Sequence, residues 1–293
     1  MIPLKRLYPR NLWEPPTGPG FGPLPEILLM LTIVTGMVDA VSVLALGRVF
    51  VANMTGNVVF AGFAIVGAPG FSLGASLFAL GGFLLGAAAE GRVASRVGHD
   101  RALHLRAAAG AELALVVIAL IIAAASGDPA VTHGLLDIAP GSVPFGAGIS
   151  DAVAGLLAIA MGIQNSAARK LAVPDLTTLV LTMTLTGIGS DSRAGRRGHL
   201  TLTRRLLAVL TMLAGAMAGA WLVLNIGAVV PLAVAAVLLA ITASWAVLAV
   251  RHPGEWRSPG SAKPAPGPSG PPGPAPEPPE SPGPVGPASL PPM

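Results

Sequence analysis

Apolar residues come in long blocks along this chain, separated by short polar stretches. Seven blocks of 18 to 24 residues cover residues 24–46, 49–66, 71–89, 107–125, 145–163, 206–224 and 227–250. A block of about 18 or more apolar residues with few charges crosses the ~30 Å hydrocarbon core of a bilayer when it forms a helix. The pattern therefore predicts an all-α integral membrane protein.

Two segments depart from this pattern because polar side chains interrupt them. The block at residues 49–66 opens with Asn53, Thr55 and Asn57, and an eighth apolar block, residues 176–188, has only 13 residues, of which five are threonine. A helix of that length measures about 20 Å, which is short for a span. Polar groups at membrane depth usually face protein or a water-filled cavity. We expect both segments to be re-entrant or broken helices.

The distribution of the 18 lysine and arginine residues separates the possible arrangements of spans. These residues prefer the cytoplasmic loops of membrane proteins. If both polar segments re-enter and the N-terminus is inside, six spans place 17 of the 18 in the cytoplasm, with Arg48 as the exception. Seven spans with the N-terminus outside place 15 inside, and eight full crossings place at best 11. The charges favour six transmembrane helices, with seven as the alternative, and cytoplasmic N- and C-termini.

The six-span arrangement divides into two halves, residues 24–140 and 141–251. Each half has a span, a polar segment and two further spans, and an odd number of spans inverts the second half relative to the first. Inverted repeats built around discontinuous helices are a recurrent transporter architecture, with the binding site between the repeats. The repeat is a hypothesis, because its sequence support is limited to Met54-Thr55 in one polar segment and Met183-Thr184 in the other.

The two ends of the chain differ from its centre. Residues 1–23 carry Lys5, Arg6 and Arg10, and we expect them to be cytoplasmic and retained, because the apolar run that follows is too long for a secretory signal. From residue 253 on, 16 of 41 residues are proline. Such a segment buries too little apolar surface to offset its ordering entropy. We predict that residues 252–293 form a disordered tail, which is either simply solvated or docks a partner.

Composition supports the membrane class and argues against other functions. Hydrophobic residues make up 53% of the chain and charged residues 11%, whereas a soluble domain has roughly 25% charged residues. The basic residues lie between apolar blocks rather than on a soluble face, which argues against nucleic-acid binding. Cysteine is absent, the five histidines fall in predicted loops and in the tail, and motifs such as Walker A, HExxH and GxSxG are missing. We expect neither an enzyme nor a bound metal or cofactor.

Asp39 is the most informative single residue, because it lies inside the first predicted span. A carboxylate at that depth costs several kcal/mol unless it is paired, hydrated or protonated, so an intramembrane acid is a candidate functional residue. Asp39 either takes part in proton coupling or locks two helices through a hydrogen bond or an ion pair. Arg48 is the candidate partner for such a pair, and Ser42 follows on the same span.

The first polar segment offers a second group of candidates. Asn53 and Asn57 are four residues apart, which places them on one face of a helix, and Thr55 and Gly56 lie between them. Unwound backbone at this point would present amides and carbonyls to a polar solute or an ion. We predict a cavity lining here, and the alternative is that these side chains only bond neighbouring helices.

The second half of the chain has its own polar residues. Gln164 and Asn165 follow the fifth apolar block, and Thr178, Thr182 and Thr186 recur every four residues. That spacing draws a stripe of hydroxyl groups along one face of a helix. The stripe either lines a pathway or bonds back to the carbonyls four residues earlier.

Other features of the sequence indicate packing rather than chemistry. Pairs of glycines with three residues between them let helix backbones approach closely. These pairs are Gly82 with Gly86 and Gly215 with Gly219. Glu90 and Glu112 flank a basic loop, and we expect them to be solvated or paired there and not to form a site.

Four runs of residues form a recognisable set. They are GMVDAVS at residues 36–42, FVANMTGN at 50–57, MGIQN at 161–165 and DLTTLVLTMTLTG at 175–187. Together they resemble the YoaK-like family, catalogued as domain of unknown function 1275. The resemblance covers about residues 26–250 and implies a multi-pass protein of the bacterial cytoplasmic membrane. The family has no established activity, so the resemblance implies no catalytic residue.

We therefore expect a secondary permease or channel for a small polar solute or a proton, with a polar site between the two halves. The alternative is a non-transporting adaptor or structural membrane protein that recruits a partner through its proline-rich tail. The candidate pathway residues are Asp39, Ser42, Asn53, Thr55, Asn57, Gln164, Asn165, Thr178, Thr182 and Thr186. Beyond the lipid bilayer and such a solute or tail partner, the sequence indicates no partner, and it leaves the oligomeric state open.

Overall fold

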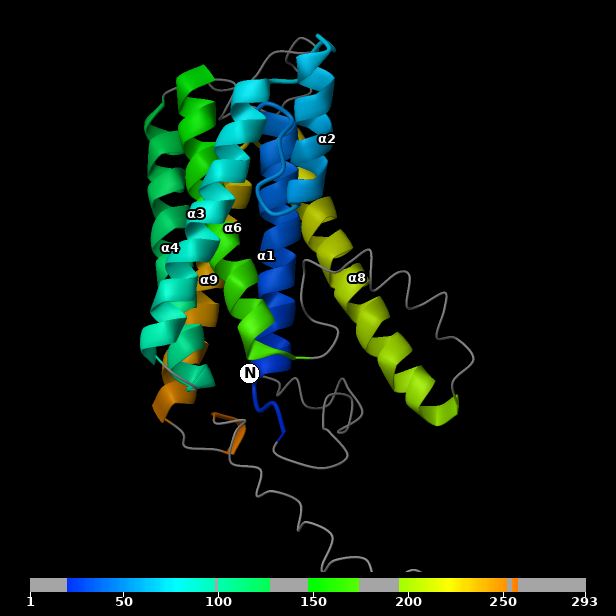
Figure 1. Cartoon of the computed structure of the whole chain (residues 1–293), viewed down its shortest axis with the longest axis vertical. Helices are drawn as coiled ribbons and strands as arrows, with labels where there is room; N and C mark the ends of the chain where they lie inside the picture. Colours follow the sequence, from blue (N-terminus) through cyan, green and yellow to red (C-terminus); the bar gives the residue numbers. More distant parts are fainter. Residues whose placement is uncertain (1–19, 98–99, 127–146, 174–194, 252–254, 258–293) are drawn as a thin grey trace, which may run out of the picture. The chain divides into compact units, whose positions relative to one another are not determined.

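A computed structural model describes residues 20–97, 100–126, 147–173, 195–251 and 255–257 of the chain (Figure 1). All of them belong to the first of the two units into which the chain divides, Met1–Gly260, and the second unit, Ser261–Met293, lies outside the described residues. The threonine-rich segment at residues 176–188 also lies outside them. Predictions about that segment and about the tail beyond residue 257 therefore stay predictions.

Seven α-helices and one 3₁₀ turn make up the described part of the chain. They are α1 (Leu24–Ala45), α2 (Met54–Ile65), α3 (Leu73–Val97), α4 (Arg101–Ala125), α6 (Ala147–Leu171), α8 (Gly195–Asn225), α9 (Val229–Arg251) and η4 (Glu255–Arg257). All the helices except α2 are long and apolar enough to cross a membrane, which makes six candidate spans among the described residues. With 12 residues, α2 is about 18 Å long, well short of the hydrocarbon thickness. The prediction of six spans is confirmed, and the seven-span alternative, which needs residues 49–66 to cross, is wrong.

Several helices begin or end beyond the predicted apolar blocks. Helix α4 begins at Arg101 rather than at residue 107, and α8 begins at Gly195 rather than at residue 206. The reason is that an apolar block marks only the length in contact with lipid, whereas a helix can continue into water. The carboxylate of Asp100 starts α4 by accepting the N–H groups of Ala102 and Leu103, as an N-cap residue does.

The basic residues of the described helices gather at one end of the bundle, called the basic end below. This end contains the starts of α1, α4 and α8 and the ends of α3, α6 and α9 (Figure 1). Arg48, in the connection after α1, lies at the opposite end. This distribution agrees with the six-span prediction, which places Arg48 on the opposite side of the membrane from the other basic residues.

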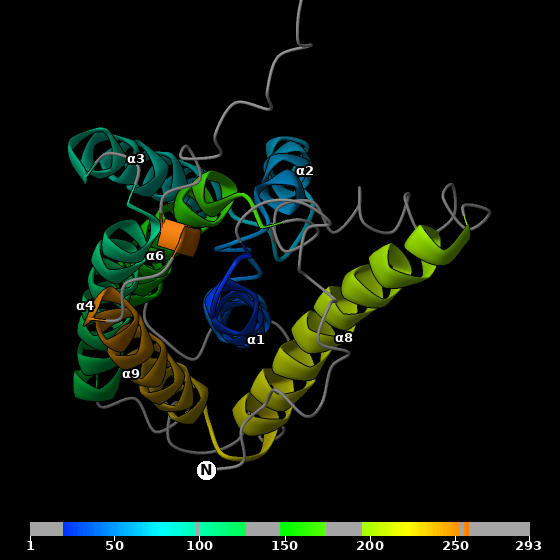
Figure 2. The same ribbon diagram turned by 90° about the horizontal axis from the view of Figure 1, so that it is seen from below.

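Helix packing repeats between the two halves of the chain. Helix α1 packs against α8 and α9, α6 packs against α3 and α4, and α4 packs against α9 (Figures 1 and 2). Exchanging α1 with α6, α3 with α8 and α4 with α9 leaves this set of contacts unchanged. In each exchanged pair, one helix runs toward the basic end and the other away from it. Such a pattern is expected of two halves with the same fold in inverted orientation.

Glycines make the same close contacts in both halves. In each half, a glycine of the first span (α1 or α6) lies so close to a carbonyl group of the facing helix (α8 or α3) that a Cβ atom would collide with it. A glycine of the facing helix makes the same kind of contact with the first span. The pairs are Gly36 with Met212, Gly215 with Ile33, Gly162 with Phe83 and Gly86 with Ile159. Equivalent residues are 126 positions apart in α1 and α6 and 129 apart in α3 and α8. The constant offsets support the inverted-repeat hypothesis, and the predicted small-residue packing is confirmed at Gly86 and Gly215.

The 3₁₀ turn η4, within the predicted tail, packs against the basic end of α4. Arg257 donates to both carboxylate oxygens of Asp100 and to the carbonyl oxygen of Val250 at 3.1 Å, and Arg101 donates to the carbonyl oxygen of Trp256 at 3.5 Å. The hydrogen bond and the positive charge of Arg257 lower the pKa of Asp100 below its ordinary value of 3.8. Residues 255–257 are therefore held by specific contacts, and the rest of the tail lies outside the described residues.

Candidate functional site

Asp39 holds a stretch of non-helical backbone inside the bundle. Its side chain is 6% exposed, and Oδ1 accepts the backbone N–H groups of Val51 at 3.1 Å and Ala52 at 2.9 Å. The other oxygen, Oδ2, is buried without a hydrogen-bond partner among the described residues. A carboxylate that accepts two N–H groups is partly compensated for its loss of water. Asp39 therefore anchors the segment that follows α1 through one oxygen atom, and within the described ranges the other oxygen makes no hydrogen bond.

The chain reaches Asp39 by turning back after α1. Helix α1 ends at Ala45, and positive φ angles of 91° at Gly47 and 59° at Arg48 reverse the backbone. The following residues descend beside α1, and α2 leads back toward the same end (Figure 1). Because Asp39 lies six residues before the end of α1, the segment penetrates roughly 9 Å. The prediction that residues 49–66 form a re-entrant segment is confirmed, and the reversal itself begins at Gly47 and Arg48.

Asn57 closes the re-entrant segment upon itself. Its Oδ1 atom accepts the N–H of Phe50 at 2.8 Å, and its Nδ2 atom donates to the carbonyl oxygen of Phe50 at 2.6 Å. The ring of Phe50 lies where a Cβ on Gly56 would be and stacks on the ring of Phe60, with centroids 5.6 Å apart. A buried amide thus satisfies backbone groups that the reversed chain leaves without helical partners. Asn57 has a structural role in this segment.

Asn53 and Thr55 are placed differently from Asn57. Asn53 precedes the helix at its N-cap position, without a side-chain capping bond, and both Asn53 and Thr55 are exposed in the part of the chain that the structure describes. The prediction that Asn53 and Asn57 share one helical face is wrong, because α2 begins only at Met54. The exposed pair lies at the deep end of the segment, close in sequence to the backbone that Asp39 anchors.

The hydroxyl side chains of α1, including the candidate Ser42, bond to their own helix, and Arg48 after α1 makes a different contact. Ser42 donates to the carbonyl oxygen of Asp39 at 3.0 Å, and Thr32 and Thr35 donate to carbonyl groups four residues earlier. Arg48 does not reach Asp39, and its guanidinium group lies against Gly70 instead. The partners of Asp39 are therefore backbone amides rather than a basic side chain.

Gln164 and Asn165 are both buried in α6. Gln164 Nε2 donates to Thr35 Oγ1 at 2.7 Å and to the carbonyl oxygen of Leu31 at 3.4 Å, so it joins α6 to α1. Its Oε1 atom is buried without a partner among the described residues. Asn165 follows Asp39 by 126 residues, the same offset that relates the glycines of α1 and α6. Thr178, Thr182 and Thr186 lie outside the described residues.

A buried ionic cluster joins α3, α4 and α6 near the basic end. Glu90 contacts His104 Nε2 through Oε1 at 2.6 Å and Lys170 Nζ through Oε2 at 3.0 Å, and the hydroxyl group of Ser166 also donates to Oε2. The expectation that Glu90 is paired is confirmed. His104 was expected in a loop, but it is buried in α4 because that helix begins at Arg101. The sequence signal for this cluster was the spacing of Ser166 and Lys170, four residues apart on one helical face.

Glu112, like His104, is a buried ionisable residue whose burial the sequence did not indicate. It was expected to be solvated or paired beside the basic loop, and this is wrong: the side chain is 1% exposed and Oε1 has no partner among the described residues. The early start of α4 explains the difference, because it places Glu112 three turns inside the helix. Among the described residues, no group of three or more His, Cys, Asp and Glu side chains is arranged to hold a metal ion.

Comparisons with known proteins identify relatives of this chain. A family model described as "Protein of unknown function (DUF1275)" matches residues 27–245. Over 165 residues the chain is 33% identical to the UPF0700 transmembrane protein YoaK of Bacillus subtilis (strain 168), and the aligned part covers 56% of this chain and 65% of that relative. The match therefore spans somewhat less than two thirds of the length of the curated relative. No solved structure matches the chain.

Proposed function

The chain belongs to the DUF1275 family of membrane proteins of unknown function, and from this premise we propose that it is a secondary permease or channel for a small polar solute. The re-entrant segment between α1 and α2 forms part of the pathway in this proposal. The observation that carries it is Asp39, which holds the segment through one oxygen atom, while the other has no partner among the described residues.

The chemistry of the segment supports a site for a polar solute. Non-helical backbone at membrane depth is tolerated where it is buried in protein or lines a water-filled cavity. Helix α2 begins there without a side-chain cap. The N–H of Gly56 donates to the carbonyl oxygen of Asn53, and the N–H groups of Met54 and Thr55, at the positive end of the helix dipole, have no acceptor among the described residues. The unpaired oxygen of Asp39 adds an acceptor, and Asn53 and Thr55 add exposed polar groups. A solute with both donor and acceptor groups fits this set.

The helix packing suggests how access to the site alternates. Glycine contacts lock α1 to α8 and α3 to α6, and each locked pair contains one helix from each half. A polar contact, from Gln164 to Thr35, joins the two pairs where α1 meets α6. We expect the pairs to move as rigid bodies against each other across this contact, as repeats do in transporters of inverted symmetry.

The same proposal assigns the orientation. Lysine and arginine prefer the cytoplasmic side, so the basic end faces the cytoplasm of a bacterial cell and both termini lie there. The re-entrant segment then enters from the outer side of the cytoplasmic membrane. Cysteine labelling near residue 100 tests this, because reaction with an impermeant reagent from outside would contradict the assignment.

Solute flux in proteoliposomes tests the function. Asp39→Asn keeps an oxygen that accepts the two N–H groups but removes the negative charge, and a hydrogen bond to a charged group contributes about 1.5–3 kcal/mol. We expect flux of the transported solute, found with a panel of radiolabelled polar solutes, to fall roughly tenfold or more. Ser244→Ala is the matched control, because Ser244 is exposed and bonds only to Ala240 of its own helix. Equal flux in wild type and Asp39→Asn for every solute, or no flux at all, would remove the proposal.

A further inference from the structure

Glu112 is the most deeply buried ionisable side chain of the described helices that lacks a partner. It lies near the middle of α4, is 1% exposed, and its Oε1 atom has no hydrogen-bond donor among the described residues. The permease proposal above does not use it. A buried acid inside a membrane span is costly to keep, so its presence calls for a functional explanation.

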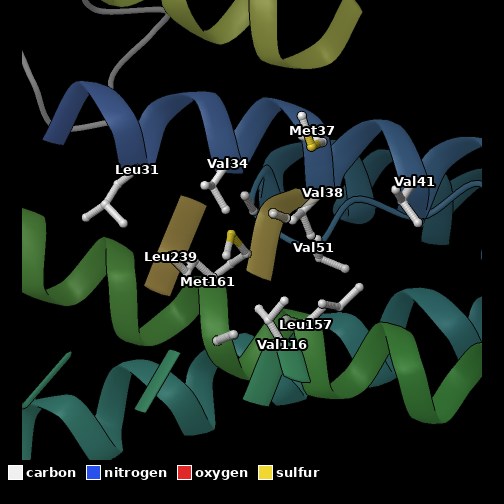
Figure 3. Packing of buried hydrophobic residues seen from close by; sticks show 14 of the residues in the cluster. Leu31, Val34, Met37, Val38, Val41, Val51, Val116, Leu157, Met161 and Leu239 are labelled. Atoms are coloured by element: carbon white, nitrogen blue, oxygen red, sulfur yellow. The ribbon is translucent and has the colours of Figure 1, made fainter. Parts of the chain in front are cut away.

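The helices packed against α4 bring no charge to the level of Glu112. One turn toward the basic end, Ala108 contacts Ile163 and Ala167 of α6. One turn in the other direction, Val116 lies among Leu157 and Met161 of α6 and Leu239 of α9 (Figure 3). The surroundings of Glu112 are therefore apolar above and below.

The ionisable residues of the neighbouring elements lie at other levels. In the described ranges they are Asp151, Arg169 and Lys170 on α6, Arg251 on α9, Glu90, Arg92 and Arg96 on α3, and Glu255 and Arg257 on η4. All of these lie near helix ends. An ionised Glu112 would have no compensating charge, so the neutral carboxylic acid is its favoured form in this position.

Gln164 has a second buried oxygen without a donor among the described residues, and it lies on a helix that packs against α4. Its Nε2 atom is used in the contact with Thr35 and Leu31, whereas Oε1 is buried without a donor. Gln164 is next to Ile163 and three residues after Met161, so it lies at the same level of the α4–α6 packing as Glu112. A neutral carboxylic acid carries an O–H group, which is the kind of donor that an unpartnered amide oxygen needs.

The ionic cluster lies between the level of Glu112 and the basic end. His104 lies two helical turns from Glu112 on the same side of α4, and it contacts Glu90, which also binds Lys170. The Lys170 side chain is 40% exposed, whereas Glu90 and His104 are buried, so the cluster leads from the surface into the bundle. Between His104 and Glu112, the buried residues of α4 are Leu105, Ala108 and Ala109. Imidazole is suited to pass protons near neutral pH.

We propose that Glu112 is an intramembrane proton-binding site that exchanges its proton with the basic end of the bundle through the Glu90, His104 and Lys170 cluster. The proton is then the coupling ion of the permease, and this part of the inference rests on the proposed function. Binding and release transfer one proton between Glu112 and water, and no other bond changes.

Infrared spectroscopy of the reconstituted full-length protein tests the binding site without any transported solute. At neutral pH the wild type should show the C=O stretching band of a protonated carboxyl group, and Glu112→Gln should lack this band. Asp151→Asn is the matched control, because Asp151 lies near the other end of α6, and it should keep the band. Labelling the wild type with ¹³C-glutamate should shift the band, which assigns it to glutamate even if Glu112→Gln does not fold. A spectrum in which labelling shifts no such band would overturn the proposal.

Exchange of the same band in D₂O tests the route. With His104→Gln, which keeps a polar side chain but cannot take up a proton, we expect deuterium to replace the proton of Glu112 about a hundredfold more slowly, the lower end of the effect of losing a proton-transfer group. An unchanged exchange rate would show that the proton does not pass through the cluster. The carboxyl band is observed without solute, so it remains even if the permease proposal fails. Conversely, if the band is absent, the solute-flux measurement is unaffected, and the two failures are distinguishable.

Discussion

Replacing Asp39 by alanine is the sharpest test of the anchored re-entrant segment. The substitution removes the acceptor of the Val51 and Ala52 N–H groups and leaves both donors buried. A hydrogen bond to a charged group contributes about 1.5–3 kcal/mol, so the two together contribute at least about 3 kcal/mol to closing the segment. Since about 1.4 kcal/mol corresponds to a factor of ten, local opening should become roughly a hundredfold more frequent.

Hydrogen–deuterium exchange of the protein in lipid nanodiscs measures this opening. Peptides covering residues 46–57 should exchange roughly a hundredfold faster in Asp39→Ala, in proportion to the opening equilibrium. Peptides from the glycine-locked part of α3 around Gly86 should not change. Asn57→Ala is the matched variant, because it frees the N–H of Phe50 while Asp39 still holds Val51 and Ala52. Unchanged protection of Val51 and Ala52 in Asp39→Ala would refute the reasoning.

Three further predictions concern other parts of the molecule. Gly86→Ala should lower the midpoint of thermal unfolding by an amount equivalent to about 1–3 kcal/mol of overpacking. Gly81→Ala is the control, because a Cβ there meets open space, and it should be neutral or slightly stabilising. Equal effects of the two substitutions would contradict the close helix contact at Gly86. The lowered pKa of Asp100 means that its contact with Arg257 is fully formed above the ordinary value of 3.8 and is lost as pH falls through the lower folded value. Fluorescence of Trp256, in a chain whose other tryptophans are phenylalanine, should change over that range and should not do so in Asp100→Asn. Deleting the tail beyond Arg257 should leave solute flux in proteoliposomes intact. If the deletion abolishes the cellular phenotype of the protein while flux is unchanged, the result favours the adaptor alternative.

Several features of the fold follow from the chain alone, because partition into lipid is a local and additive property. A run of apolar residues crosses the membrane whatever its neighbours are, so the six spans were readable from the blocks and from the charges between them. The re-entry of residues 49–66 was readable for the same reason, since Asn53, Thr55 and Asn57 disfavour a full crossing. The cost of a carboxylate at membrane depth likewise singled out Asp39.

The partners of these residues were decided only by the tertiary structure. Whether Asp39 meets Arg48 or the backbone of Val51 and Ala52 depends on how the chain reverses after α1, and no local pattern encodes that distance. Glu112 was expected to be solvated or paired where it flanks the basic loop, because its burial depends on where α4 begins and on which neighbours cover it. Spans are set by each segment's own free energy in lipid, whereas side-chain partners are set by contacts between segments far apart in the chain.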